Sequence, residues 1–126
     1  MTANGVLLAA GVLSIFVGFV HSILGEVLIF RRLRDGGIIP TMANPPLLEK
    51  HVRILWATWH IASIFGWAVG SLLLRLSFTG QVEEQIVIHV IAVSMFSSGL
   101  LVLIATKARH PGWLGLMGVA VLCWLV

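Results

Sequence analysis

The sequence predicts an all-α protein, a polytopic membrane four-helix bundle that forms one domain over residues 1–126. The first observation is composition: 59% of the residues are hydrophobic and 10% are charged, and the mean hydropathy is +1.04. A soluble domain is about half apolar and about a quarter charged. The second observation is that apolar residues gather in four long runs. Because lipid offers no partner to backbone N–H and C=O groups, such runs should cross a bilayer as helices rather than as an open sheet.

Each apolar run is a candidate membrane span, since about 20 helical residues cross a hydrocarbon core of about 30 Å. The expected spans cover about residues 6–30, 54–76, 86–106 and 113–126. No Lys or Arg precedes the first run, and the run is too long for the apolar part of a signal peptide, so we expect a retained helix. The fourth run is short for a full span.

The connection between the first two runs, residues 31–53, is longer than most loops in compact folds. Connections of this kind are functional or mobile. The residues from Leu47 onward are expected to start the second helix, with Pro45 or Pro46 near the first turn, where a missing N–H costs nothing.

Basic residues are unevenly distributed along the chain. Seven of the eight Lys and Arg residues follow the first or the third run, and only Arg75 lies near the other side. The positive-inside rule therefore predicts a multi-pass protein of the inner (plasma) membrane with both termini on the outer side. The lipid bilayer is the expected partner. The net charge of +3 does not indicate nucleic acid, because the basic residues flank apolar runs rather than form an aromatic-interleaved patch.

Ionisable residues inside the apolar runs define the candidate site. Each costs roughly 2.5 to 3.5 kcal/mol at the centre of a span, so each needs a partner. His21 and Glu26 lie in the first run and His60 in the second, at similar depths in the cytoplasmic half. His89 is expected on the opposite side of the membrane, and His51 lies at the start of the second run.

Two helical stripes are expected to bring these residues together. In the first run, small and polar residues recur at three- and four-residue spacing, the pattern that lets membrane helices approach closely; they are Gly11, Ser14, Gly18, His21 or Ser22, and Gly25. The second run carries a polar and aromatic stripe of the same spacing, namely Arg53, Trp56, His60, Ser63 or Ile64, Trp67 and Ser71. If these stripes face each other, His21, Glu26 and His60 meet, with Arg53 or His51 beside them.

Several interpretations of this cluster remain open. His nitrogen and Glu oxygen suit Zn, Fe, Mn or Cu, so His21, Glu26 and His60 are candidate ligands of a divalent transition metal ion. However, His21 and Glu26 are five residues apart, which lacks the alignment of strong ligand motifs. Alternatively, Glu26 pairs with Arg53 or a protonated histidine and joins the helices, or the cluster transfers protons without a metal.

Haem, held by His21 and His60 as axial ligands, ranks below a metal ion. The chain has no second pair of histidines in its spans and no CxxCH motif for covalent attachment. Its single cysteine, Cys123, excludes a disulfide within the chain and a cysteine metal motif.

HSILGE at residues 21–26, followed by RILWATWHIASIFGW at residues 53–67, resembles a pattern in small, functionally uncharacterised four-helix bacterial membrane proteins. In that pattern an HSxLGE element precedes an RxxWH-like element. The resemblance covers roughly the first 70 residues, and the matching positions are His21, Ser22, Leu24, Gly25, Glu26, Trp59 and His60, with Arg53 upstream. It implies a four-helix fold and a shared polar site, and it transfers no reaction.

Three functions follow as expectations. The first is a metal or redox-cofactor site in the membrane with Glu26 as ligand or base, which leaves enzyme activity open. The second is a non-enzymatic membrane scaffold or accessory subunit, and the third is proton-coupled transport of a small cation with Glu26 as the protonatable group. Glycine-rich faces on the first and fourth runs favour association. A homo-oligomer or a larger membrane complex is therefore expected in each case.

Overall fold

The computed structural model describes residues 3–126, and within that range the chain is helical and contains no strand. Four α-helices are present: α1 (Gly5–Leu28), α2 (Glu49–Thr79), α3 (Glu84–Thr106) and α4 (Gly112–Trp124). A 3-10 turn, η1 (Phe30–Leu33), follows α1 directly. The all-α prediction is confirmed for this part of the chain.

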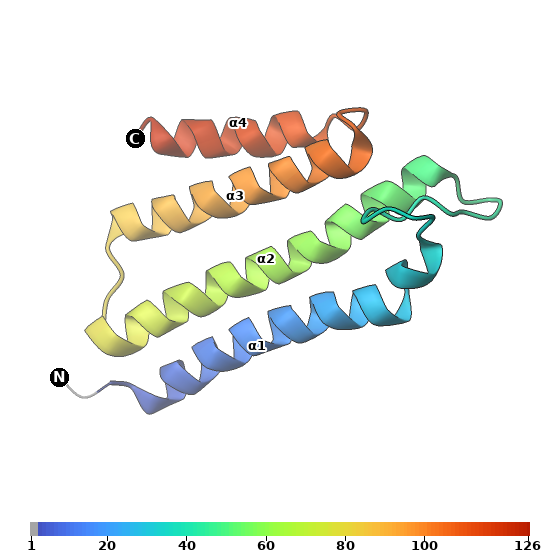
Figure 1. The fold of residues 1–126 in the computed structure, drawn as a ribbon. Coiled ribbons are helices and arrows are strands. Elements are labelled where there is room, and N and C mark those ends of the chain that lie inside the picture. The colour runs from blue at the N-terminus through green and yellow to red at the C-terminus, as the bar shows by residue number, and fades with distance from the viewer. Residues whose placement is uncertain (1–2) are drawn as a thin grey trace.

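The helices lie in chain order, each packed against the next (Figure 1). α1 packs on α2, α2 on α3, and α3 on α4, while α1 and α4 form the two opposite edges of the row. A closed bundle would also join its first and last helices. The arrangement is therefore more open than the bundle predicted from the sequence, and the outer side of α1 exposes many large apolar side chains.

Three of these helices, α1, α2 and α3, are long and apolar enough to cross a membrane. α2 starts earlier than the predicted run, because the polar first turn from Glu49 is already helical. α4 has 13 residues, or about 20 Å at 1.5 Å per residue. It is an apolar helix below span length, so the fourth predicted span matches a real helix that is short for crossing.

Local sequence explains where the helices begin and end. The Asn4 side chain accepts hydrogen bonds from the backbone N–H groups of Val6 and Leu7 and caps α1. Gly80 adopts a left-handed conformation with φ 71° and ends α2. The second helix begins at Glu49, after Pro45 and Pro46 rather than at them, and the His51 ring accepts a hydrogen bond from the Leu48 N–H at 3.1 Å. His51 thus caps the N-terminal end of α2.

Glycines spaced seven residues apart line the side of α1 that faces α2. Gly11, Gly18 and Gly25 are the buried residues of this helix. A Cβ at these positions would meet Leu74, Trp67 and Trp59 of α2, respectively, at 2.1 to 2.9 Å. The predicted small-residue stripe is therefore confirmed as the packing face, and large α2 side chains fill the notches that the glycines leave.

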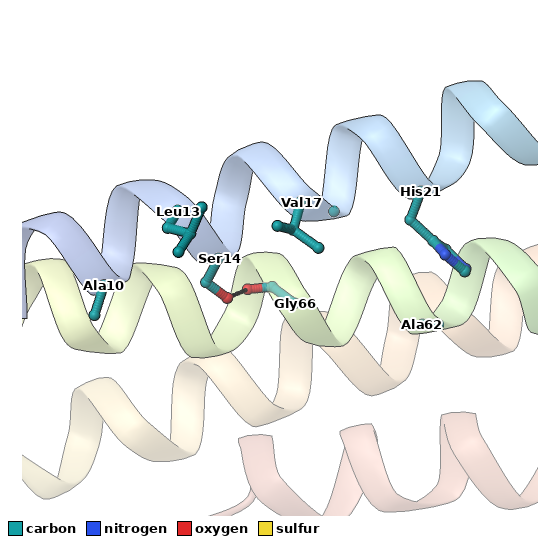
Figure 2. A pocket seen from close by; sticks show the side chains of 8 residues that line it. Ala10, Leu13, Ser14, Val17, His21, Ala62 and Gly66 are labelled. Carbon is teal, nitrogen blue, oxygen red and sulfur yellow. Dashed lines mark hydrogen bonds between the residues drawn. The ribbon is translucent and has the colours of Figure 1, made fainter.

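The indole N–H groups that enter these notches donate to backbone carbonyls of α1. Trp59 donates to the carbonyl of His21 at 2.9 Å, and Trp67 donates to the carbonyl of Ile15 at 3.2 Å. In the same interface Ser14 donates to the carbonyl of Gly66 at 2.7 Å (Figure 2). These bonds fix the register of α1 against α2, because each one joins a specific pair of helical turns.

The buried apolar core lies at the end of the row where α1 finishes and α2 begins. It is formed by Phe30, Trp56, Ala57, Val102 and Ala105, from η1, α2 and α3. The basic residues that follow α1, start α2 and follow α3 lie at this end, which we call the basic end. They are Arg31, Arg32, Arg34, Lys50, Arg53, Lys107 and Arg109.

Candidate functional site

The carboxylate of Glu26, in the last turn of α1, receives three hydrogen-bond donors. The Trp56 indole N–H donates to Oε1 at 2.5 Å, and the His60 Nε2 lies 2.9 Å from the same oxygen. The Arg34 guanidinium forms an ion pair with Oε2. The Glu26 and Arg34 side chains are each 26% exposed, so the pair lies at the edge of the helix interface.

Helix periodicity explains two of these donors. Trp56 and His60 are four residues apart on α2, so both side chains point from one face towards α1. Their rings meet edge to face with centroids 5.0 Å apart. Phe30 of η1, which is 3% exposed, lies beside the His60 ring, with the two ring centroids 6.2 Å apart. The site is therefore walled by aromatic rings.

The second nitrogen of the His60 ring is also hydrogen bonded. Nδ1 lies 2.9 Å from the Ser22 hydroxyl on α1, and that hydroxyl lies 2.7 Å from the hydroxyl of Ser63 on α2. Ser63 is 1% exposed. A continuous chain of exchangeable groups thus runs from buried Ser63 through Ser22 and His60 to partly exposed Glu26.

The geometry allows two protonation states of His60 when Glu26 is ionised. A carboxylate only accepts hydrogen bonds, so Nε2 must carry a proton towards it. Nδ1 can then accept from the Ser22 hydroxyl in a neutral ring, or donate to it in a protonated ring. Because hydroxyl hydrogens rotate freely, Ser22 and Ser63 can adapt to either state while the heavy atoms stay in place.

Arg34, rather than Arg53 or His51, is the cationic partner of Glu26. In the sequence, Arg34 belongs only to the group of basic residues that predicts the membrane orientation. The chain turns back after η1, and the Arg34 Nε donates to the carbonyl of Ile38 at 2.5 Å, which steadies the side chain. Arg53 instead donates to Glu49 at 2.7 Å and to the Ala105 carbonyl on α3 at 3.0 Å. Arg53 was therefore predicted wrongly as the partner of Glu26, whereas the predicted histidine partner is present as His60.

His21 does not join Glu26 and His60. Its ring stacks on Trp59, with centroids 4.4 Å apart and an interplanar angle of 7°. Figure 2 shows the His21 side chain pointing towards α2 beside Ala62, at one end of a groove of about 440 Å³. Its Nε2 is buried and has no hydrogen-bond partner among residues 3–126.

The metal site predicted from His21, Glu26 and His60 is therefore not assembled. Within the described residues, no group of three or more His, Cys, Asp or Glu side chains is placed to hold a metal ion. The physical reason is the five-residue step between His21 and Glu26, which turns the two side chains to different sides of α1. The structure unites two of the three predicted residues, and Ser22 takes the third position.

Ser22, Trp56 and Arg34 are the site residues that were not predicted from the sequence, although Ser22 and Trp56 lay on the two predicted stripes. Ser22 was a member of the predicted stripe, and its four-residue spacing to Glu26 is the alignment that places two side chains on one helical face. That signal could have identified it. Arg34 carried no comparable signal, because its position depends on how the chain folds back after α1.

His89 lies in α3 near its start, away from the basic end, as the sequence predicted. It lines a groove between α2 and α3 together with Trp67 and Ser71.

The candidate site consists of Glu26, His60 and Ser22, with Trp56 and Arg34 as further donors to Glu26. No protein-family model, curated protein or solved structure matches this chain.

Proposed function

We propose that the chain is a multi-pass protein of the inner membrane whose functional centre binds a proton at the His60–Glu26 pair. The membrane location is supported by three apolar helices of spanning length. The proposed orientation puts both termini outside, because the basic residues after α1, at the start of α2 and after α3 gather at one end. α4 begins at the basic end, and the depth that it reaches does not alter the site, which lies between α1 and α2.

One observation carries the proton-binding proposal: both ring nitrogens of His60 are hydrogen bonded, one to Glu26 and one to Ser22. A ring held in this way gains or loses a proton without moving. Intramembrane His and Glu residues of this kind are typical of proton relays in pumps and transporters. In this proposal the HSILGE segment, residues 21–26, supplies Ser22 and Glu26, the two residues that hydrogen bond to the His60 ring.

The function that this site supports best is proton-coupled transport of a small cation. Glu26 is the protonatable group: the protonated ring of His60 gives its Nε2 proton to the carboxylate and is left neutral, with its remaining proton on Nδ1 towards the Ser22 hydroxyl. The Arg34 guanidinium forms an ion pair with this carboxylate. Glu26 is also partly exposed, and it lies in the last turn of α1, next to the basic end. A cation competes with the proton for this carboxylate.

Transport is tested in proteoliposomes that contain a pH-sensitive dye, with proton flux driven by a Na⁺ or K⁺ gradient. We expect Glu26→Gln to abolish the flux, because an amide cannot exchange the proton, and Glu26→Asp to retain part of it. Glu84→Gln is the matched control, since Glu84 is an exposed carboxylate at the other end of the molecule. Wild-type flux in Glu26→Gln, or no flux in the wild-type protein with either cation, contradicts the proposal.

A second candidate function is a non-enzymatic scaffold or accessory subunit. One observation favours it: Gly115 and Gly118 of α4 are exposed, and a Cβ at either position would have no atom within 4 Å. Such a face lets another helix approach closely. If the scaffold is the true function, both Glu26 variants change assembly or stability alike, and neither changes ion flux specifically.

A further inference from the structure

A cavity of about 470 Å³ lies at the basic end, separate from the Glu26 site. Its lining comes from the start of α2 and from the turn between α3 and α4, segments that are more than fifty residues apart in the sequence. The basic residues that line it are Lys50, Arg53, Lys107 and Arg109, and the acidic residue is Glu49. Its volume is within the range of about 300 to 1,000 Å³ that is usual for small-molecule sites.

The Arg53 side chain lines this cavity and is held in place by hydrogen bonds. Its side chain is 12% exposed and is held by Glu49 at 2.7 Å and by the Ala105 carbonyl at 3.0 Å. A guanidinium carries five N–H donors, so donors remain after these two bonds. Because the group is already held in place, an anion that binds it need not first order the side chain.

The end of α3 brings the other cations to the same place. Lys107 and Ala108 adopt left-handed backbone conformations, with φ 52° and 61°. Their N–H groups bond back to the carbonyls of Ile104 and Leu103, which ends the helix. The chain therefore reverses there, and Lys107, Arg109 and His110 face the start of α2 across the cavity.

We infer that this cavity binds the phosphate of an anionic phospholipid headgroup. Four cations face one carboxylate, and Glu49 is already paired with Arg53, so the cavity carries excess positive charge. Basic pockets between membrane helices on the cytoplasmic side are suited to such headgroups. Ile54 also lines the cavity, at the point where the apolar part of α2 begins. This favours a lipid over a free anion.

The inference uses the proposed membrane location and is independent of proton binding at Glu26. Its test is the affinity of tag-free, detergent-purified protein for dioleoyl phosphatidylglycerol, compared with dioleoyl phosphatidylcholine, by native mass spectrometry. We expect preferential binding of phosphatidylglycerol. The double variant Lys107→Gln, Arg109→Gln should weaken that binding by about tenfold or more, since a single charge-assisted hydrogen bond to the phosphate contributes about tenfold.

The matched control is the double variant Arg31→Gln, Arg32→Gln. It removes the same charge from exposed positions near the same end but outside the cavity. We expect it to retain most of the affinity, and size-exclusion chromatography confirms that both variants are folded.

An equal loss of affinity in both double variants overturns the inference, because it indicates general charge attraction rather than a site. Equal binding of the two lipids also overturns it. If inorganic phosphate alone binds the wild-type protein as tightly as phosphatidylglycerol does, the lipid assignment fails and the cavity is a free-phosphate site. Each of these results is distinct from those that contradict the proposed transport, which are wild-type flux in Glu26→Gln and no flux in the wild-type protein.

Discussion

Glu26 is a charged side chain placed in an otherwise apolar helix, and its neighbours compensate for its removal from water. A carboxylate with two oxygens can accept several donors, and here an indole, an imidazole and a guanidinium supply them. Hydrogen bonds to charged groups contribute more than neutral ones, about 1.5 to 3 kcal/mol each. The cluster therefore joins α1, α2 and the segment after η1, besides holding the proposed proton site.

Arg34→Gln should lower the free energy of unfolding more than Arg32→Gln does. The first removes the ion-pair partner of Glu26, whereas Arg32 is exposed and has no hydrogen bond to another side chain within residues 3–126. Because the pair is a quarter exposed, we expect a loss of about 1 to 2 kcal/mol in the free energy of unfolding rather than the larger loss of a fully buried pair. The measurement is unfolding from detergent micelles by SDS titration. Equal effects of the two substitutions would show that the ion pair contributes nothing.

At the scale of the helix, the α1–α2 interface depends on glycines that face large side chains. The seven-residue spacing of Gly11, Gly18 and Gly25 places one notch every two turns on a single face of α1. Trp59 and Trp67 enter two of the notches and donate to α1 carbonyls. Packing and hydrogen bonds therefore act together, which suits helices that have little hydrophobic driving force between them in lipid.

Gly25→Ala should destabilise the protein, and Gly115→Ala should not. An added methyl group at Gly25 would lie 2.1 Å from the Trp59 ring nitrogen, so the indole must move and lose its bond to the His21 carbonyl. Overpacking of this kind costs about 1 to 3 kcal/mol. At Gly115 the methyl group meets no atom, and alanine gains up to about 1 kcal/mol in helix propensity. Thermal unfolding of both variants in detergent is monitored by circular dichroism. Similar shifts of the unfolding midpoint in the two variants would contradict the packing argument.

At the scale of the whole molecule, the open row separates two ends of different chemistry. The basic end holds the Glu26 site, the apolar core and the basic cavity. The opposite end, where α2 turns into α3, carries the weak Arg75–Glu83 pair at 3.7 Å. This asymmetry agrees with the proposed cytoplasmic position of the basic end.

Cysteine labelling tests that orientation. In a Cys123→Ser background, single cysteines replace Asp35, in the exposed loop after α1, and Gln81, in the exposed turn after α2. A membrane-impermeant maleimide added to intact cells should label Gln81→Cys, whereas Asp35→Cys should react only after the membrane is opened. The reverse pattern would show that the positive-inside rule predicts the wrong orientation here.

Much of the helical framework could be predicted from the sequence, because it depends on local and periodic information. The apolar runs locate α1, α2 and α3 within a few residues, apart from the polar first turn of α2. The stripe of glycines identifies the face of α1 that packs on α2, and Glu26 and His60 were predicted to meet, together with His21. The length of the fourth run already indicated a helix that is short for a span.

The sequence by itself determined that this protein is apolar and helical and that ionisable side chains lie within its apolar runs, since composition and helical periodicity do not depend on long-range contacts. The tertiary structure decided which groups complete the site: Ser22 instead of His21, and Arg34 instead of Arg53. It also decided that the helices form an open row. These features depend on side-chain direction and on where a loop returns, and both are set by distances between segments that lie far apart in the chain.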